Sequence, residues 1–528
     1  MPSNLRPSRQ DAFWRSLGSR HDWLPDRNEA LQFLTTFGLA TVGLLAVLRA
    51  DVHYIDDIGR DRAFYDWADA GRPIAGPLYR LIAGGYIFDI SPFSQLLGLA
   101  ATAAAAHVVV VQLLQVRRRV EGIAASLLIV LSPYGLEIHA YRYDSMLYAI
   151  ALLLTVGAIF ILRRSTGIGA IASGALLIGA SYGIFPPMAG IGLVLLGLIW
   201  CADFVRMHRV PKELPKLMVI VVGLHLSGMA TMAAVASRMP LSAYTLERST
   251  FTAAHLGVNV WRGGQAVLAL IVTDWSRSPI GIAFLALLTI APIVVLIRSA
   301  VVASTNRPQD ILGGIALASV PVVLFLTFAL GTLHVQLILD QTPMMARCFT
   351  GFGFLLAGAV ALLCLEIDKR PARVLRVAIG AISIVLVVWL ISLASLFGNL
   401  LSSQDRYARA MAMEMFTAFQ ALRADDSGVQ FAAIDGVIMR PPPNALVYRV
   451  YPMMMRIVPV YTDFNAFWTS RFFEAQGARL PYDATCRSDA WRTGREPPKP
   501  TASNANFDVY VVGPCAIFSF KPVSTDRS

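Results

Sequence analysis

Two adjacent aspartates, Asp56 and Asp57, form the most chemically suggestive group in the sequence. They lie in a polar segment that also contains Arg60 and Arg72. A carboxylate in such a segment is suited to remove a proton from an attacking hydroxyl group, and the arginines are suited to bind a phosphate. Adjacent carboxylates could instead hold a divalent cation.

A second polar segment follows about eighty residues later, between two apolar runs. Its ionisable and aromatic side chains are those of Glu137, His139, Tyr141, Arg142 and Asp144. Because the segment is short, these side chains must cluster where the apolar runs end. A carboxylate at such a place is costly unless it is paired or reaches water, so we expect an arginine, Arg142 or Arg72, as the partner.

The elements that position these segments are apolar runs of bilayer length. The 528 residues are 56% hydrophobic and only 15% charged, whereas soluble chains carry about a quarter charged residues. The net charge of +11 comes mostly from residues between the runs. This pattern orients a membrane protein, for which anionic lipids suffice as the partner, and we expect no nucleic acid to bind.

The runs predict a polytopic α-helical membrane protein with about eleven transmembrane helices. The predicted spans are 31–50, 92–116, 121–137, 145–162, 167–184, 187–203, 217–237, 279–297, 311–331, 347–366 and 375–398. Lys and Arg collect on every second connection, on the side of the polar tail 1–30, which predicts a cytoplasmic tail. The tail is followed by a run too long for a cleavable signal. The outer loops would be 51–91 and 138–144.

Three further segments carry more specific predictions. Residues 74–90 contain Arg80 and two glycines and would break the charge alternation if they crossed, so we predict an interfacial or re-entrant segment. Residues 262–276 predict a helix in or near the outer surface. Residues 61–70 predict a short helix that begins at Asp61, with Trp67 towards the membrane.

An odd number of spans places residues 399–528 on the periplasmic or extracellular side. There charges and prolines return, and two β-like stretches, 430–434 and 507–512, with a helical candidate at 405–423 indicate a small α/β module. Cys486 and Cys515 are its two cysteines. In an oxidising compartment they are candidates for one disulfide, although two unrelated thiols remain the alternative.

The chemical interpretation must be weighed against a simpler one. Aspartates in an outer loop are usually only solvated. The adjacent pair, the arginines and a second acidic, aromatic segment on the same side together favour a catalytic site. The histidines are more readily explained by hydrogen bonds than by metal binding, since no CxxC or HxxxH spacing is present.

These residues carry a family resemblance. Tyr54-Ile-Asp-Asp57 with Arg60, Gly71-Arg72-Pro73 and Asp89-Ile-Ser-Pro92 resemble the start of the type II glucosyl transferases, bacterial serotype-converting enzymes of the C-type (GT-C) superfamily. The stretches Pro133-Tyr134 and Tyr141–Ser145 are similar to the next recognisable part, and Arg347 matches a basic residue before a later span. The likeness covers about the first 160 residues well. A polar residue expected within Ser181–Pro187 is missing, and the C-terminal module is large for the compact members.

The resemblance implies transfer of a hexose, glucose in that family, from a polyprenyl-phosphate carrier to a surface glycan such as O-antigen. It implies a partner flippase and a carrier-loading glycosyltransferase. We expect Asp57 as the base with Asp56 as second choice, Asp144 in a positioning role, and inversion at the anomeric carbon. Phosphate or substrate would contact the residues Arg60, Arg72, Arg142, Arg347, Tyr141, Glu137 and His139. We expect no cofactor, because a phosphate monoester needs less neutralisation by a cation than a pyrophosphate.

Three other functions stay open at this point. A flippase or transporter for lipid-linked oligosaccharides would favour an internal repeat and charged residues deep in the membrane, and neither is evident. A polysaccharide polymerase or ligase would place arginines in larger, later outer loops, and the loop 238–278 contains several. A purely structural membrane protein would leave the two acidic loops unexplained.

Overall fold

The computed structural model describes most of the chain. The described residues are 26–60, 66–209, 213–248, 250, 252–305, 319–320, 322–323, 326–327, 339–341, 344–369, 373–425, 427–435, 440–461, 466–478, 480–487 and 499–521. The predicted span 311–331 falls mostly outside them, as do most of the polar tail and the first half of the predicted helix 61–70.

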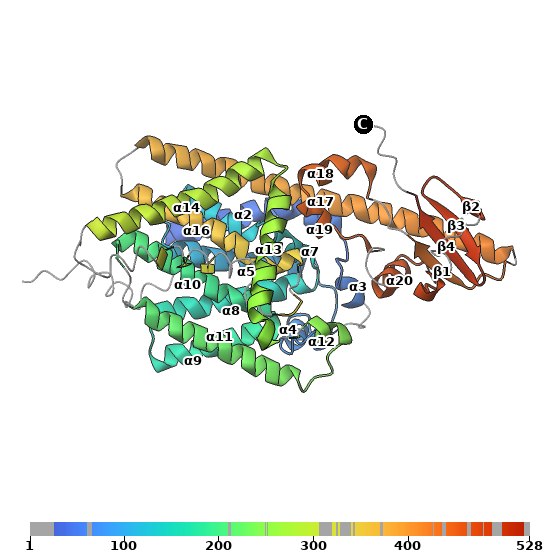
Figure 1. Ribbon diagram of the computed structural model, residues 1–528, viewed down its shortest axis with the longest axis horizontal. Helices are drawn as coiled ribbons and strands as arrows, with labels where there is room; N and C mark the ends of the chain where they lie inside the picture. Colours follow the sequence, from blue (N-terminus) through green and yellow to red (C-terminus); the bar gives the residue numbers. More distant parts are fainter. Residues whose placement is uncertain are drawn as a thin grey trace, which may run out of the picture.

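Long apolar helices form the body of the molecule (Figure 1). Among the described residues, nine helical segments are long and apolar enough to cross a membrane. They are α2 (Arg27–Ala50), α5 (Phe93–His107) continued by the π-helix η2 (Val108–Leu113), α8 (Asp144–Arg164), α10 (Pro186–Met207), α11 (Leu214–Ala236), η3 (Ala253–His255) with α13 (Leu256–Trp275), α14 (Pro279–Thr305), α16 (Gly351–Asp368) and α17 (Arg373–Ala424). A shorter apolar helix, α9 (Ile168–Ile184), packs beside α8. The polytopic helical architecture is confirmed, while the number eleven stays a prediction.

The predicted span 121–137 is interrupted. Helix α6 (Arg119–Val130) has 12 residues and is followed by a turn and the short helix α7 (Leu136–Ala140). Pro133 cannot donate the backbone hydrogen bond that would continue the helix, so the chain turns there. The turn brings α7 beside the first residues of α8 and helps to form the second polar segment.

Helix α13 differs in direction from the rest of the bundle. Figure 1 shows it running steeply across α14, α8 and α17 rather than along them. Its inner face buries Gly263, Val267 and Leu270, while Trp261 and Leu268 remain exposed. Length and composition would let α13 span, but its direction fits the expected helix at the surface of the bilayer, whose apolar side would meet lipid.

Residues 74–90 form a short element. Helix α4 (Ala75–Ile82) has eight residues and therefore measures about 12 Å, well short of the roughly 30 Å of a hydrocarbon core. Gly84 and Gly85 follow with φ of 79° and 104°, which end the helix. The element is too short to cross, as expected for an interfacial or re-entrant segment.

The prediction for Trp67 was wrong. Residues 67–71 form turns rather than the end of a helix, and the Trp67 side chain is fully buried inside the protein. Its indole N–H donates to Asp144, and its ring contacts Arg60 and Tyr79; lipid could not replace these contacts.

Helix α17 joins the bundle to the C-terminal module without a break. It has 52 residues, so the predicted helix 405–423 is confirmed, and it continues the last span without a break at 398/399. Gly398 lets α17 approach α2 closely, because a Cβ at this position would lie 2.3 Å from the backbone nitrogen of Val47. The two helices make the most extensive pairing in the bundle.

The module contains a four-stranded sheet of order β1-β4-β3-β2, formed by β1 (Phe431–Asp435), β2 (Ala502–Ser503), β3 (Phe507–Val512) and β4 (Cys515–Phe520). Strand β1 is parallel to β4, and the other pairs are antiparallel. The two predicted β stretches correspond to β1 and β3. Cys486, in η8 (Ala484–Arg487), and Cys515 are joined by a disulfide.

Between β1 and the later strands the chain returns to the bundle. The elements η6 (Pro442–Asn444), α18 (Ala445–Val450) and α19 (Met453–Ile457) lie there, before α20 (Ala466–Ala475) rejoins the module. Met453 and Met454 belong to the main core of the bundle. Arg456 donates to the buried Asp274 of α13 at 3.1 Å. This segment therefore ties the module to the helical bundle.

Candidate functional site

The first loop, residues 51–91, begins where α2 ends. Asp51 closes that helix in the left-handed conformation, with φ of 52°, and Ile55 also has a positive φ of 44°. These two bends turn the chain back on itself before the single-turn helix α3 (Asp57–Arg60). The loop is thereby folded against the second loop, residues 138–144, instead of extending into solvent.

Asp57 joins the two loops through backbone hydrogen bonds. Its Oδ2 accepts from the N–H groups of Tyr54 at 3.0 Å and Arg142 at 2.9 Å, and its Oδ1 accepts from the N–H of Tyr143 at 3.3 Å. The side chain is fully buried. Burial raises the pKa of the Asp57 carboxyl, while these N–H donors act in the opposite direction. Both oxygens are thus occupied by donors of the protein itself.

Arg60 and Asp144 form a second connection between the loops. The Arg60 Nη2 lies 2.8 Å from Asp144 Oδ2, and neither side chain is exposed. The guanidinium carbon lies 4.1 Å from the ring centroid of Trp67, whose indole N–H donates to the other Asp144 oxygen. A buried charge pair needs this degree of hydrogen bonding to offset its desolvation.

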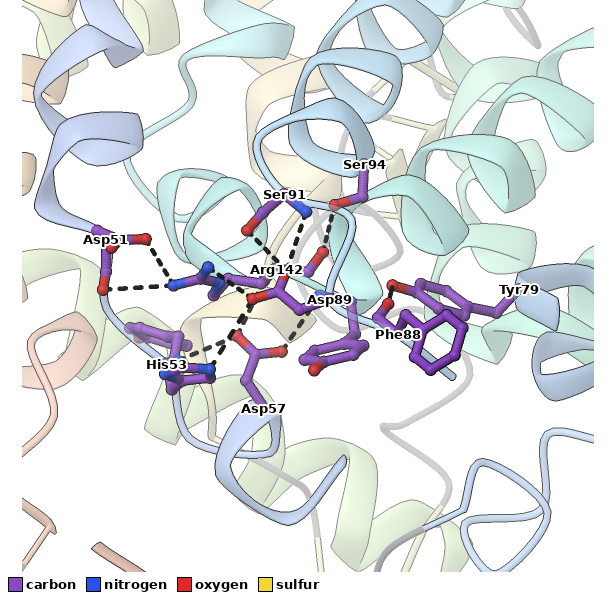
Figure 2. Close-up of polar contacts among 11 residues, drawn as sticks. Asp51, His53, Asp57, Tyr79, Phe88, Asp89, Ser91, Ser94 and Arg142 are labelled. Atoms are coloured by element: carbon purple, nitrogen blue, oxygen red, sulfur yellow. Dashed lines mark hydrogen bonds and ion pairs between the residues drawn. The ribbon is translucent and has the colours of Figure 1, made fainter. Parts of the chain in front are cut away.

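Arg142 lies between two carboxylates of the first loop, as Figure 2 shows. Its guanidinium is 2.6 Å from Asp51 and 2.5 Å from Asp89. Burial would raise the pKa of Asp89, but hydrogen bonds from Ser91 and the charge of Arg142 lower it below its ordinary value. Asp89 is therefore ionised, and Arg142 is already neutralised inside the protein.

Arg347 reaches the same region from far along the chain. It lies in the short helix η5 (Ala346–Cys348), and its backbone N–H and Nη1 donate to the two carboxylate oxygens of Glu137 at 2.8 and 2.5 Å. Its guanidinium carbon is 5.6 Å from the ring centroid of Tyr141. Burial would lower the pKa of Arg347, but the partners Tyr141, Glu137 and Asp56 raise it well above its ordinary value. The cation is permanent.

Asp56 differs from its neighbour. Its side chain is partly exposed, and no residue in the described part of the chain hydrogen-bonds to its carboxylate. Its charge acts on Arg60, Arg347 and Tyr141. Asp56 therefore faces the cationic, aromatic side of the loops with both oxygens available.

Arg72 completes this side of the site. Its guanidinium carbon lies 4.8 Å from the ring centroid of Phe185 and 5.9 Å from that of Tyr148. Tyr148 stands one helical turn after Asp144 on α8, so both side chains leave the same face of that helix. The sequence reasoning missed Tyr148 and Trp67, although the i, i+4 spacing from Asp144 was a usable signal for Tyr148.

The structure thus divides the residues singled out from the sequence. Ring contacts, an ion pair and charge interactions connect one group, made up of Asp56, Arg72, Arg347, Glu137, Tyr141 and Tyr148. Asp57, Arg60, Arg142 and Asp144 are engaged in holding the loops together. His139 is buried, and its Nε2 lies 2.9 Å from the carbonyl of Val130, so its recorded partner belongs to the helical core and not to this group. Within the described residues no group of three or more His, Cys, Asp or Glu side chains is arranged to hold a metal.

Comparison with known proteins bears directly on this arrangement. A family model described as glucosyl transferase GtrII matches residues 45–419, which is well over half of the chain and includes every residue of the site. The chain belongs to the GtrII glucosyl transferase family. The match begins at the end of α2 and stops within α17, so the sheet and the segment 440–461 lie beyond the GtrII family model.

The chain is also similar to a protein of Salmonella phage P22, named as an uncharacterized 55.3 kDa protein in the gtrB 5' region. It is 25% identical over 226 residues, which cover 41% of this chain and 45% of that protein. The GtrII chain described here thus spans less than half of that relative. No solved structure matches the chain described here.

Proposed function

We propose that this protein is a membrane glycosyltransferase that moves a hexose, glucose by the family's name, from a polyprenyl-phosphate carrier to a surface glycan such as O-antigen. Family membership supports the reaction class. The observation that carries the proposal is the partly exposed Asp56 carboxylate, whose charge acts on Arg347 and on the phenol of Tyr148, the ring over which Arg72 lies. A base next to phosphate-binding cations is what hexosyl transfer from a phosphate carrier requires.

We assign the base to Asp56 rather than to Asp57. A general base must reach the proton that it abstracts, and its lone pairs must be available to the acceptor hydroxyl. Asp57 is fully buried and accepts three backbone N–H bonds, whereas Asp56 has neither constraint. Asp57 and Asp144 then act as positioning residues that fix the loop on which Asp56 stands.

The reaction proposed is a single displacement. The acceptor hydroxyl oxygen attacks the anomeric carbon while Asp56 takes the hydroxyl proton. The bond from the anomeric carbon to the phosphate oxygen breaks, and the electron pair leaves with the polyprenyl phosphate. Arg347 and Arg72 stabilise the charge that develops on that phosphate. Direct attack inverts the anomeric configuration and requires neither a cofactor nor a metal.

The same proposal places the site on the outer face of the bacterial inner membrane, with the C-terminus on that side. Helix α8 has Asp144 at one end and Arg163 and Arg164 at the other. Its 21 residues measure roughly 30 Å, about one hydrocarbon core. Positive residues favour the cytoplasmic side, and the module's disulfide suits an oxidising compartment. The donor would be loaded and flipped by a carrier-loading glycosyltransferase and a flippase.

The test compares surface glycans of cells that carry wild type, Asp56→Asn or Asp483→Asn, with membrane levels matched. Asp483 is a partly exposed aspartate of the module, remote in sequence from both loops, and serves as the control. We expect wild type and the control to add a hexose with inverted configuration, and Asp56→Asn to lose about two to four orders of magnitude in rate. A glycan that is identical in all strains, including one without the protein, would refute the proposal.

A further inference from the structure

Two tyrosine hydroxyls beside Asp56 are buried without a hydrogen-bond partner among the described residues. They belong to Tyr141, in the second loop, and Tyr148, on α8, whose side chains are 0% and 1% exposed. The neighbouring Tyr54 differs, because its hydroxyl donates to the carbonyl of Ile457 at 2.6 Å; the Tyr448 hydroxyl, in α18, is the other buried phenol without a partner among the described residues. A buried polar group that lacks a partner costs about 1–3 kcal/mol.

The two phenols stand in one aromatic group. Their ring centroids are 5.7 Å apart in an edge-to-face arrangement. Tyr54 packs against Tyr141 at 4.8 Å, and Phe185 packs against Tyr148 at 4.1 Å. The rings are thereby held on both sides, and neither can swing its hydroxyl into solvent without disrupting this packing.

Cations cover both rings. Arg347 lies over Tyr141 and Arg72 lies over Tyr148, at 5.6 and 5.9 Å from the ring centroids. The charges of both arginines also act on the Tyr148 phenol, as does that of Asp56. Burial raises the pKa of the Tyr141 phenol well above its ordinary value, so its hydroxyl keeps its proton and is available as a donor.

We propose that the Tyr141 and Tyr148 hydroxyls donate hydrogen bonds to the phosphate oxygens of the sugar donor, between Arg72 and Arg347. This inference rests on the proposed function and names the groups that bind its donor. An anion accepts from all four residues at once, and bonds to a charged partner are stronger than bonds to a neutral one. A sugar hydroxyl would also satisfy the phenols, but it would form no charge-assisted contact with Arg72 and Arg347.

The test uses the full-length protein in detergent with two probes, farnesyl phosphate and farnesyl phosphoglucose. We expect Tyr141→Phe and Tyr148→Phe each to weaken binding of both probes by about tenfold or more, the value of a hydrogen bond to a charged group. Without ligand, neither variant should melt below wild type, because each loses only a hydroxyl that had no partner.

Tyr448→Phe is the matched control. Tyr448 is buried in α18 with Arg440 4.7 Å from its ring centroid, a similar environment at another place. The affinity of this variant for both probes should equal that of wild type.

Two results would overturn the inference. One is unchanged affinity of Tyr141→Phe and Tyr148→Phe for farnesyl phosphate. The other is a loss restricted to farnesyl phosphoglucose, which would place the hydroxyls on the sugar. If wild type bound farnesyl phosphate no better than farnesol, the inference and the proposed donor would fail together. If the variants bound weakly as expected but wild type transferred no hexose, the inference would stand and the proposed function would fail.

Discussion

Asp57 and Asp56 are adjacent in sequence, yet their removal should have opposite consequences. In Asp57→Ala, the backbone N–H groups of Tyr54, Arg142 and Tyr143 lose their acceptor in a fully buried position. At about 1–3 kcal/mol for each unsatisfied donor, the loss is about 3–9 kcal/mol. This is comparable to the whole stability of many domains, so most of the variant should fail to fold.

Asparagine variants should lower the free energy of unfolding less than Asp57→Ala does. In Asp57→Asn the amide oxygen can still accept from Tyr54 and Arg142, which share Oδ2, but the amide nitrogen meets the N–H of Tyr143. One donor is lost, so the expected cost is about 1–3 kcal/mol. Asp56→Ala and Asp56→Asn remove a partly exposed group without hydrogen-bond donors, which should change stability by no more than about 0.5 kcal/mol.

The assay measures two quantities for each variant: the thermal unfolding midpoint of the purified protein in detergent, and the transfer rate per folded molecule. We expect the midpoint to fall in the order wild type, Asp57→Asn, Asp57→Ala, with substantial activity left in the folded fraction of Asp57→Asn. The Asp56 variants should melt like wild type and be inactive. An Asp57→Asn variant that melts like wild type and is inactive, beside an active Asp56→Asn, would show that Asp57 is the base.

Two further predictions concern other contacts of the site. Arg347→Lys should keep the charge and the backbone N–H bond to Glu137 but lose the guanidinium bond to that carboxylate. Because a compact ammonium cannot reproduce the planar fork, the transfer rate should fall by about tenfold or more. Arg449→Lys, on an exposed part of α18, should leave the rate unchanged; equal rates in both variants would argue against Arg347 as a phosphate-binding residue. Tyr461→Phe removes the hydroxyl that donates to the carbonyl of His53. The free energy of unfolding should therefore fall by about 0.5–1.5 kcal/mol. An unchanged denaturation midpoint would argue against this contact between the module and the first loop.

Much of the architecture follows from the sequence because bilayer geometry is a strong constraint. Long apolar runs must be helices, and the basic residues separate the two sides. The charged residues of both loops were found in this way. Which carboxylate is occupied by backbone donors could not be found, because Asp56 and Asp57 differ by one residue and the positive φ of Ile55 decides which one turns inward.

Other errors have the same origin in local pattern. Residues 399–424 are polar, which suggested a separate module. They instead form the second part of α17, because the segment contains no proline or glycine that would end the helix. Tyr148 stands in an apolar run and looks like any residue of a span. Its role depends on Arg72 and Phe185, which other parts of the chain bring to it. Contacts of this kind are tertiary and have no local signature.

The continuity of α17 also sets a rule for recombining this protein with others. A helix of 52 residues is about 78 Å long and turns by about 100° with each residue. The C-terminal module docks on α3 through Ile58, which shares its core, so module and loop meet only at one rotational phase. One residue inserted beyond Gly398 would swing the module about a quarter turn around the rod, whereas seven would nearly restore its phase while lifting it by about 10 Å. Chimaeras that exchange the module must therefore conserve the length of this helix, whatever sequence they place in it.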